Sequence, residues 1–281
     1  MRKDLPPVGE SAKVRRLLAR LRLVTVCAEA HCPNQAECFS CGTATFMILG
    51  DTCTRGCRFC AVAHGRPAPP RADEPQAIAE AAAELGLHHV VITSVTRDDL
   101  ADGGAGQFTA AIAAVRSRLP QAAIEVLTPD FLGDCGSIDV VLAARPDVFN
   151  HNVETVPRLY EAVRPQAQYH RSLSVLARAA RRRGADGAPV TKSGIMLGLG
   201  ETPQEVASVL ADLRQAGVDA LTIGQYLAPS PSHAPIERFV TPAEFHALEQ
   251  AAIDMGFTAV ASGPYVRSSY QAEGILRRAR R

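Results

Sequence analysis

The chain has little that would tie it to a membrane or to nucleic acid. Its apolar runs fall well short of the roughly 20 residues that a membrane-spanning helix needs. The N-terminal sequence MRKDLPPVGE lacks the apolar stretch of a signal peptide. The formal net charge is only +1, which argues against a nucleic-acid binder held by a broad basic field. We therefore expect a cytoplasmic protein that binds neither membranes nor nucleic acid.

Other absences narrow the class of protein. No G-x-G-x-x-G sequence follows an expected strand, so the fingerprint of dinucleotide-binding Rossmann folds is missing. Lysine is scarce, since only Lys3, Lys13 and Lys192 stand among 30 basic residues, and we draw no function from this bias. Tryptophan is absent altogether. With 281 residues, of which 47% are hydrophobic, the chain can bury a sizeable core without disulfide bonds.

Cysteine, by contrast, is plentiful, with eight residues. Disulfide bonds rarely persist in the cytoplasm, so these thiols need another explanation. Six of them form two tight groups near the N-terminus: Cys27, Cys32 and Cys38, followed by Cys53, Cys57 and Cys60. Clustered cysteines in a reducing compartment indicate metal ligands.

From residue 44 onward, apolar strand patterns alternate with helical ones, and polar residues gather just after the strands. This alternation predicts an α/β fold with a parallel sheet and helices outside. The residues alone leave open a doubly wound sheet, a full barrel or a partial barrel. The expected strands span 45–49, 89–95, 123–127, 148–153, 190–197, 220–226 and 257–261, and the expected helices span 75–85, 105–118, 172–183, 202–216 and 242–255, after a polar arm or short helix over 1–20.

The second cysteine group has the spacing C-x3-C-x2-C, in the sequence CTRGCRFC directly after the first expected strand. Three thiolates can bind three irons of a 4Fe–4S cluster and leave the fourth iron open, whereas electron-carrying clusters usually have four cysteines. Zinc normally takes four ligands in paired spacings. The group, with Phe59 before its last cysteine, resembles the signature of the radical S-adenosylmethionine (SAM) superfamily, which implies that the open iron binds SAM.

The first cysteine group, CAEAHCPNQAEC, has the spacing C-x4-C-x5-C. Fourteen residues separate Cys38 from Cys53. Taken alone, this spacing also fits a structural zinc site completed by His31. Beside a radical SAM loop, a second iron–sulfur cluster is favoured, and one of its irons then needs a ligand from elsewhere in the chain.

The two cysteine groups, in this order and at this separation, resemble the lipoyl synthase family. The likeness runs from about residue 24 to residue 273. The stretches that carry it include CPNQAEC, GTATFMILGD, SVTRDDLADGGA, FNHNVETVPRLY, the following VRP, TKSGIMLGLGET, QYLAPSPSHAPI and GFTAVASGPYVRSSY. The chain departs from the family at its short N-terminal arm and in its lack of tryptophan, where Phe39 takes one of the usual positions.

The resemblance implies two 4Fe–4S clusters and SAM as cofactors. Cys53, Cys57 and Cys60 would hold the SAM-binding cluster. The auxiliary cluster would be held by Cys27, Cys32 and Cys38, with Ser269 of the R-S-S-Y sequence as its fourth ligand, and would be consumed as the source of sulfur. Cys41 and Cys135 are then expected to be non-ligands.

The family also implies a partial TIM-type (β/α)6 barrel whose open end is covered by N-terminal and C-terminal extensions. We divide the chain accordingly into an extension over 1–43 with the auxiliary-cluster motif, a radical SAM barrel over 44–262 and a tail over 263–281 that supplies the serine ligand. Residues at the barrel rim or inside it are expected to contact SAM: Asp98, Asp99, Asn150, Asn152, Glu154 and Lys192. Weaker candidates are His151, Gln225, Tyr226 and Arg267.

The reaction implied is the insertion of two sulfur atoms at carbons 6 and 8 of an octanoyl group bound to a carrier protein. Expected partners are octanoylated lipoyl carrier proteins or domains, a reductant such as flavodoxin or ferredoxin, and an iron–sulfur carrier that rebuilds the auxiliary cluster. The alternative is another sulfur-inserting radical SAM enzyme with an auxiliary cluster. A non-catalytic iron–sulfur or zinc scaffold is the rival from a different class, and it would need neither an open iron nor a polar barrel rim.

Overall fold

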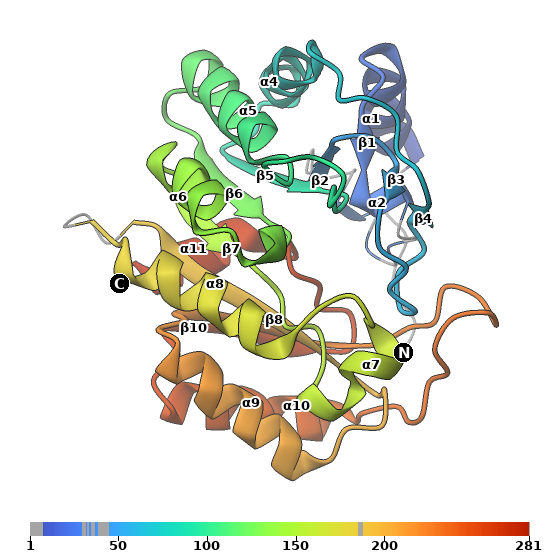
Figure 1. The fold of residues 1–281 in the computed structure, drawn as a ribbon, viewed down its shortest axis with the longest axis vertical. Helices are drawn as coiled ribbons and strands as arrows, with labels where there is room; N and C mark the ends of the chain where they lie inside the picture. Colours follow the sequence, from blue (N-terminus) through green and yellow to red (C-terminus); the bar gives the residue numbers. More distant parts are fainter. Residues whose placement is uncertain are drawn as a thin grey trace.

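The structure, a computed structural model, describes residues 8–29, 32, 34, 37–38, 45–184 and 188–280. Its main element is an eight-stranded sheet in the order β1-β2-β5-β6-β7-β8-β9-β10 (Figure 1). Every neighbouring pair from β2 to β10 is parallel, and only β1 runs antiparallel, against β2. The strands are β1 Val24–Thr25, β2 Thr45–Ile48, β5 His89–Ser94, β6 Ala123–Leu127, β7 Val148–Asn150, β8 Val190–Leu197, β9 Ala220–Gln225 and β10 Ala259–Gly263, with β3 Thr52–Cys53 and β4 Ala63–His64 forming a separate pair.

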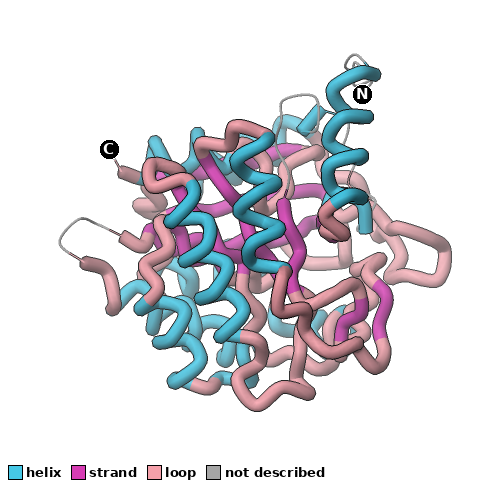
Figure 2. Tube along the Cα trace, turned by 90° about the horizontal axis from the view of Figure 1, so that it is seen from above, coloured by secondary structure: helices cyan, strands magenta, loops and turns pink. Residues whose placement is uncertain are grey.

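Helices cover the outer face of this sheet, as Figure 2 shows from above. They are α1 Val8–Arg20, α2 Val26–Glu29, α4 Glu74–Glu84, α5 Ala105–Arg118, α6 Cys135–Ala143, α7 Tyr160–Val163, α8 Tyr169–Arg181, α9 Pro203–Gln215, α10 Pro242–Asp254 and α11 Ala272–Ala279. Capping boxes start α9 at Thr202 and α10 at Thr241. In the described part of the chain, none of the helices has the length and apolar character needed to cross a membrane.

The parallel strands are buried on both faces, as expected when helices cover one face and the barrel interior fills the other. All six residues of β9 are buried, and so are the first five of β5. This burial accounts for the near-continuous apolar runs from which the strands were predicted.

The barrel is partial, because β2 and β10 do not pair. After β10 the tail contacts the end of β9, where a Cβ atom on Gly224 would lie only 2.3 Å from the Val266 carbonyl oxygen. It continues to the start of β2, where the Thr45 hydroxyl donates to Ser269 Oγ over 2.8 Å. Helix α11 then packs Ile275 and Leu276 against the first residues of several strands. The tail thus connects the β9 and β10 side of the sheet with β2, and α11 covers the end of the barrel at which the parallel strands begin.

The predicted alternation of strands and helices is confirmed, with seven parallel strands from β2 to β10. The strand predicted over 148–153 was too long, since β7 ends at Asn150. The pairing with β8 is interrupted after Asn150 and resumes as an isolated parallel bridge between Glu154 and Ile195, where Glu154 has a left-handed backbone with φ 65°. The last strand was placed two residues early, and α6 and α11 were not predicted at all.

Candidate functional site

A cavity of about 520 Å³ lies where the N-terminal segment, the barrel rim and the tail meet. This volume is in the usual range for ligand and cofactor sites. Its lining includes five of the six clustered cysteines and two tail serines: Cys27, Cys32, Cys53, Cys57, Cys60, Ser268 and Ser269. The fold therefore brings both cysteine groups and the tail to a single space.

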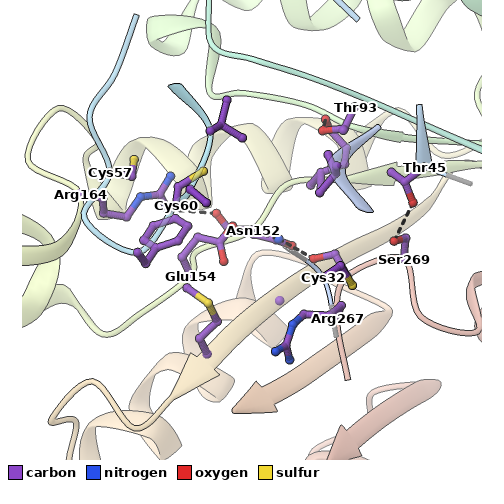
Figure 3. Close-up of a pocket in the computed structure, with 18 of the residues that line it drawn as sticks. Cys32, Thr45, Cys57, Cys60, Thr93, Asn152, Glu154, Arg164, Arg267 and Ser269 are labelled. Atoms are coloured by element: carbon purple, nitrogen blue, oxygen red, sulfur yellow. Dashed lines mark hydrogen bonds between the residues drawn. The ribbon is translucent and has the colours of Figure 1, made fainter. Parts of the chain in front are cut away.

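Within this cavity the two cysteine groups face each other. Figure 3 shows Cys57 and Cys60 on one side, and Cys32 and Ser269 on the other. Cys38 is described but does not line the cavity, and its backbone N–H donates to the Asn34 carbonyl oxygen over 2.9 Å. The arrangement leaves space between the groups for a ligand that contacts both.

The loop from Cys53 to Cys60 is fixed to the barrel by Arg55. Its guanidinium, 4% exposed, donates to both carboxylate oxygens of Asp98 over 2.6 and 2.9 Å and to Asp130 over 2.7 Å. The backbone N–H groups of Arg55 and Thr96 point at Cys53 Sγ over 3.4 and 3.3 Å. A buried bidentate pair of this kind holds its partners in one geometry, so the loop is held in place against the ends of β5 and β6.

The cysteine side chains are suited to binding a cationic centre. Burial raises the pKa of Cys27 and Cys57, and it raises the pKa of Cys60 to about 12. A bound iron displaces the thiol proton outright, so such thiols gain charge only with their metal. Among the described residues, no three His, Cys, Asp or Glu side chains gather around one point as a single metal ion requires. A 4Fe–4S cluster instead spreads its ligands over separate irons, and the donor set fits such a cluster.

The tail serines make different contacts. Ser269 accepts from Thr45, as described above, while Ser268 Oγ accepts from Asn152 Nδ2. Both serines line the cavity. Figure 3 shows Thr45 and Ser269 joined on the side of Cys32. Thr45 also hydrogen-bonds to Cys27, so Ser269 and the first cysteine group share a neighbour.

Asn152 and Glu154 occupy the middle of the cavity wall. Asn152 Nδ2 donates to Glu154 Oε1 over 3.0 Å, and the buried Asn152 Oδ1 has no hydrogen-bond partner in the described part of the chain. Burial raises the pKa of Glu154, which also has the left-handed backbone described above. Strained backbone and an unpaired buried oxygen are typical of ligand-binding positions. Gly194 is needed beside them, since a Cβ atom there would lie 2.9 Å from Asn152 Oδ1.

Four residues predicted to contact SAM lie outside this cavity. Asp98 is paired with Arg55, and Asp99 with Arg97. Asn150 Nδ2 and Lys192 Nζ both donate to Glu125 Oε1 inside the barrel, over 3.0 and 2.8 Å. None of the four lines the cavity. The geometry gives them internal partners and so offers no support for a direct contact with SAM.

The four weaker candidates, His151, Gln225, Tyr226 and Arg267, all line the cavity, but most of their polar groups already have partners within the described part of the chain. His151 lines the cavity, but its ring nitrogens contact the Thr128 carbonyl oxygen and Ser172 Oγ, each over 2.9 Å, and burial lowers its pKa to about 4. It is therefore a neutral packing residue at pH 7. Gln225 holds the loop after β9, through bonds to the carbonyl of Arg238 and the N–H of Val240.

Tyr226 lines the cavity, with its hydroxyl donating to the Ala234 carbonyl oxygen over 2.8 Å. Arg267 also lines it and appears near Cys32 in Figure 3. Cys135 is exposed at the start of α6, away from the cavity. The predictions about His31, Phe39 and Cys41 lie outside the described residues.

Sequence reasoning missed three charged residues of the cavity lining: Arg55, Asp130 and Arg164. Arg55 and Arg164 stand inside stretches that had been recognised, TRGC and VRP, but nothing in the sequence tells which way such side chains point. Asp130 follows β6, in the same relation to its strand as Asp98 to β5. Asp130 could have been predicted from its position just after a strand, because the carboxyl ends of parallel strands meet at one rim of the barrel.

The fold and the cavity can now be compared with those of known protein families. Residues 47–213 match the family model of the radical SAM superfamily. Solved structures of the same fold include methylornithine synthase, with a TM-score of 0.55 and 13% identity over 96% of this chain and 91% of that one. A maturase of the FeFe hydrogenase has a TM-score of 0.57 and 12% identity over 98% of this chain and 75% of that one. At such identities the likeness shows the fold alone.

Curated relatives are much more similar in sequence. A lipoyl synthase of Methylococcus capsulatus is 58% identical over 94% of this chain and 81% of its own length. One of Desulfotalea psychrophila is 55% identical over 99% of this chain and 92% of its own length. The chain therefore belongs to the lipoyl synthase family, as the sequence stretches had indicated.

Proposed function

We propose that this cavity is the active site for the reaction of the family, the insertion of two sulfur atoms at carbons 6 and 8 of a protein-bound octanoyl group. One observation carries the residue assignment: both cysteine groups open onto the same cavity. A substrate carbon must lie within reach of the radical source and of the sulfur source in turn. A cavity between the two groups provides that arrangement.

Cys53, Cys57 and Cys60 are the ligands of the SAM-binding cluster in this proposal. When bound, the cluster and SAM together supply a 5′-deoxyadenosyl radical, which can remove hydrogen from an unactivated C–H bond. The protein holds this loop rigidly through Arg55, whose two carboxylate partners are 26% and 1% exposed. Asn152 and Glu154 are positioned to contact SAM from the middle of the cavity wall.

Cys27, Cys32, Cys38 and Ser269 are the ligands of the auxiliary cluster. Thr45 donates to Ser269 Oγ and also hydrogen-bonds to Cys27, which supports a position for Ser269 beside the first cysteine group. A serine oxygen is a weaker ligand for iron than a thiolate. Weak ligation is consistent with a cluster that must open to release sulfur.

The substrate is an octanoylated protein. We further propose flavodoxin or ferredoxin as reductant, an iron–sulfur carrier that rebuilds the auxiliary cluster, and a cytoplasmic location. The support for these is chemical: the reaction needs single electrons and consumes a cluster, and six clustered thiols require a reducing compartment. Lipoyl carrier domains with an octanoyl-lysine are the substrates we propose.

The proposal is tested by metal content and by product. Anaerobically reconstituted protein is expected to bind about eight irons and as many sulfides, because each 4Fe–4S cluster contains about four. With SAM, a reductant and an octanoyl-lysine peptide, it should form 5′-deoxyadenosine and a peptide that carries two sulfur atoms, both measured by mass spectrometry. About four irons, or zinc alone, would contradict the two-cluster assignment. 5′-Deoxyadenosine without sulfur on the peptide would contradict the choice of reaction.

Ser269→Ala provides a sharper test of the tail. The variant should still cleave SAM, because the second cysteine group is untouched. Its yield of sulfur-containing peptide per 5′-deoxyadenosine should fall by about 10–100-fold or more, since changes around a metal site typically cost that much. Ser268→Ala removes the adjacent hydroxyl, which contacts Asn152 instead. The Ser268→Ala variant should keep its yield of sulfur-containing peptide per 5′-deoxyadenosine within about twofold of wild type. This holds even if the loss of the contact with Asn152 weakens SAM binding, because the yield is counted per SAM cleaved. Equal losses in the two variants would exclude Ser269 as a specific ligand.

A further inference from the structure

The segment after α7 packs directly against the second cysteine group. The Arg58 N–H donates to the Val163 carbonyl oxygen over 2.8 Å, and the Gly56 N–H donates to Gln166 Oε1 over 2.9 Å. These two bonds bracket Cys57 in the loop and Arg164 in the segment. They fix the backbone of one relative to the other, so the placement of Arg164 beside Cys57 is a property of the fold.

Arg164 is buried, with 8% of its surface exposed. Its guanidinium donates to the carbonyl oxygens of Asn152 and Val153 over 3.1 and 2.9 Å, and to the Tyr160 hydroxyl over 3.4 Å. All three acceptors are neutral, and the buried Nε has no hydrogen-bond partner among the residues that the structure describes. The positive charge is therefore held in place without a direct carboxylate partner among the described residues, although it lies close enough to Glu154 to oppose the rise that burial causes in the pKa of that group.

Other buried cations in the described part of the chain are neutralised. Arg55 pairs with two carboxylates, Arg97 with Asp99 and Lys192 with Glu125. No ion pair joins Arg164 to a carboxylate within the described residues, and the nearby Glu154 is hydrogen-bonded to Asn152. Burying a charge without a counter-ion costs stability. We therefore expect Arg164 to face an anion that binds in the cavity.

The charge faces the cavity on the side of Cys57. Figure 3 shows Arg164 next to Cys57 and Cys60, and all three line the cavity. Burial raises the pKa of the Cys57 thiol, and the largest influence that opposes this rise is Arg164. Three thiolates on a 4Fe–4S core give a net charge of about −1, which becomes about −2 on reduction. An anion of this kind is the partner that the guanidinium lacks.

We propose that Arg164 is the buried counter-charge of the cluster at Cys53, Cys57 and Cys60, and that it favours the reduced form of that cluster. The inference rests on the ligand assignment above. Reduction adds one electron from the external donor and no proton, so the negative charge in the cavity rises by one. A fixed positive charge in a water-poor site stabilises the more negative state. Arg164 thus makes the electron transfer that precedes SAM cleavage easier.

The test measures reduction in the absence of turnover. All proteins are full-length and carry Cys27→Ala, Cys32→Ala and Cys38→Ala, so that only the cluster in question gives a signal. Its reduced fraction is followed by electron paramagnetic resonance at a series of fixed ambient potentials. Arg164→Gln should lower the ratio of reduced to oxidised cluster at least tenfold at a given potential, a shift of about 59 mV for one electron. Arg164→Lys keeps the charge and should stay within about threefold of the parent.

Arg58→Gln is the matched control, because Arg58 belongs to the same loop but its side chain is exposed. Solvent screens an exposed charge, so this variant should match the parent protein. Equal shifts in Arg164→Gln and Arg164→Lys, an unchanged Arg164→Gln, or an equal shift in Arg58→Gln would each overturn the counter-charge role. Failure of the parent to bind about four irons would instead overturn the ligand assignment, which separates the two hypotheses.

Discussion

Cys57→Ala is expected to reduce SAM cleavage to the background of a protein-free reaction. Cys57 is the middle ligand of the C-x3-C-x2-C loop and lines the cavity with Cys53 and Cys60. The proposed cluster has three protein ligands and one open iron, so the loss of one ligand leaves only two irons held. Without that cluster no electron reaches SAM. The measurement is 5′-deoxyadenosine formed per protein under excess reductant, together with the iron content.

The iron count locates the defect. The Cys57→Ala variant should keep about four irons, those of the auxiliary cluster, because the first cysteine group is intact. Cys135→Ala is the control, since Cys135 is exposed at the first position of α6 and does not line the cavity. It should keep about eight irons and full cleavage. A Cys57→Ala protein that still cleaves SAM would refute the ligand assignment, and a loss in Cys135→Ala would point to general thiol damage.

The elements that the sequence predicted well are those with strong local signals. Helix α9 was found from its capping box, Thr202 with Glu205, and the structure contains both bonds of that box. Helix α6, with the sequence CGSIDVVLA, was missed because its residues give no clear apolar stripe. Its available signal was Asp134, whose side chain accepts from the Ser137 N–H as an N-cap.

The cysteine groups were predictable for a related reason. The spacing of cysteines within one loop is visible in the sequence, so it can be interpreted without knowledge of the fold. The convergence of both groups on one cavity is not local, and it followed only from the family resemblance. The contact of the tail with β2 could not be predicted either. Thr45 and Ser269 are 224 positions apart, and neither sequence stretch indicates that it contacts the other.

The residues predicted to contact SAM show what sequence reasoning cannot distinguish. Asp98 follows a strand at the barrel rim, as a ligand-binding carboxylate would, yet it pairs with Arg55 from 43 positions away. An aspartate after a strand has the same local signature whether it meets a ligand or a distant arginine. Asn152 and Glu154 are distinguished from it only by the cavity and by the backbone of Glu154.

The interior of the barrel yields the second large expected effect, on stability. Lys192 is fully buried, and its ammonium group donates to Glu125 Oε1 over 2.8 Å. Glu125 also accepts from Asn150 Nδ2, and His89 Nε2 lies 3.4 Å from Oε2. Burial disfavours the charged carboxylate, but Lys192 and His89 outweigh this and lower the pKa of Glu125 to about 2. At pH 7 the pair is therefore an ion pair enclosed by the sheet.

Glu125→Gln should cost about 3–5 kcal/mol of stability, because it leaves the Lys192 ammonium buried without a counter-ion. For a chain of 281 residues, an unfolding entropy of about 2.1 cal/mol/K per residue makes that a midpoint temperature lower by roughly 5–9 °C. Proteins with bound clusters do not unfold in a simple two-state manner, so all variants are compared at one scan rate and one cluster loading. The glutamine keeps the shape of the side chain and an acceptor for Asn150, which confines the change to charge.

The double variant Glu125→Gln with Lys192→Met decides between charge and packing. If the loss in the single variant comes from an unpaired ammonium, removal of that ammonium should restore more than half of the lost midpoint temperature, since well-packed apolar replacements of buried pairs are often neutral. If the loss comes from disturbed packing, the double variant should be the least stable of all. Restored stability with normal 5′-deoxyadenosine formation would make the pair a structural element of the barrel. Restored stability with loss of 5′-deoxyadenosine formation would support the sequence-based prediction that Lys192 contacts SAM.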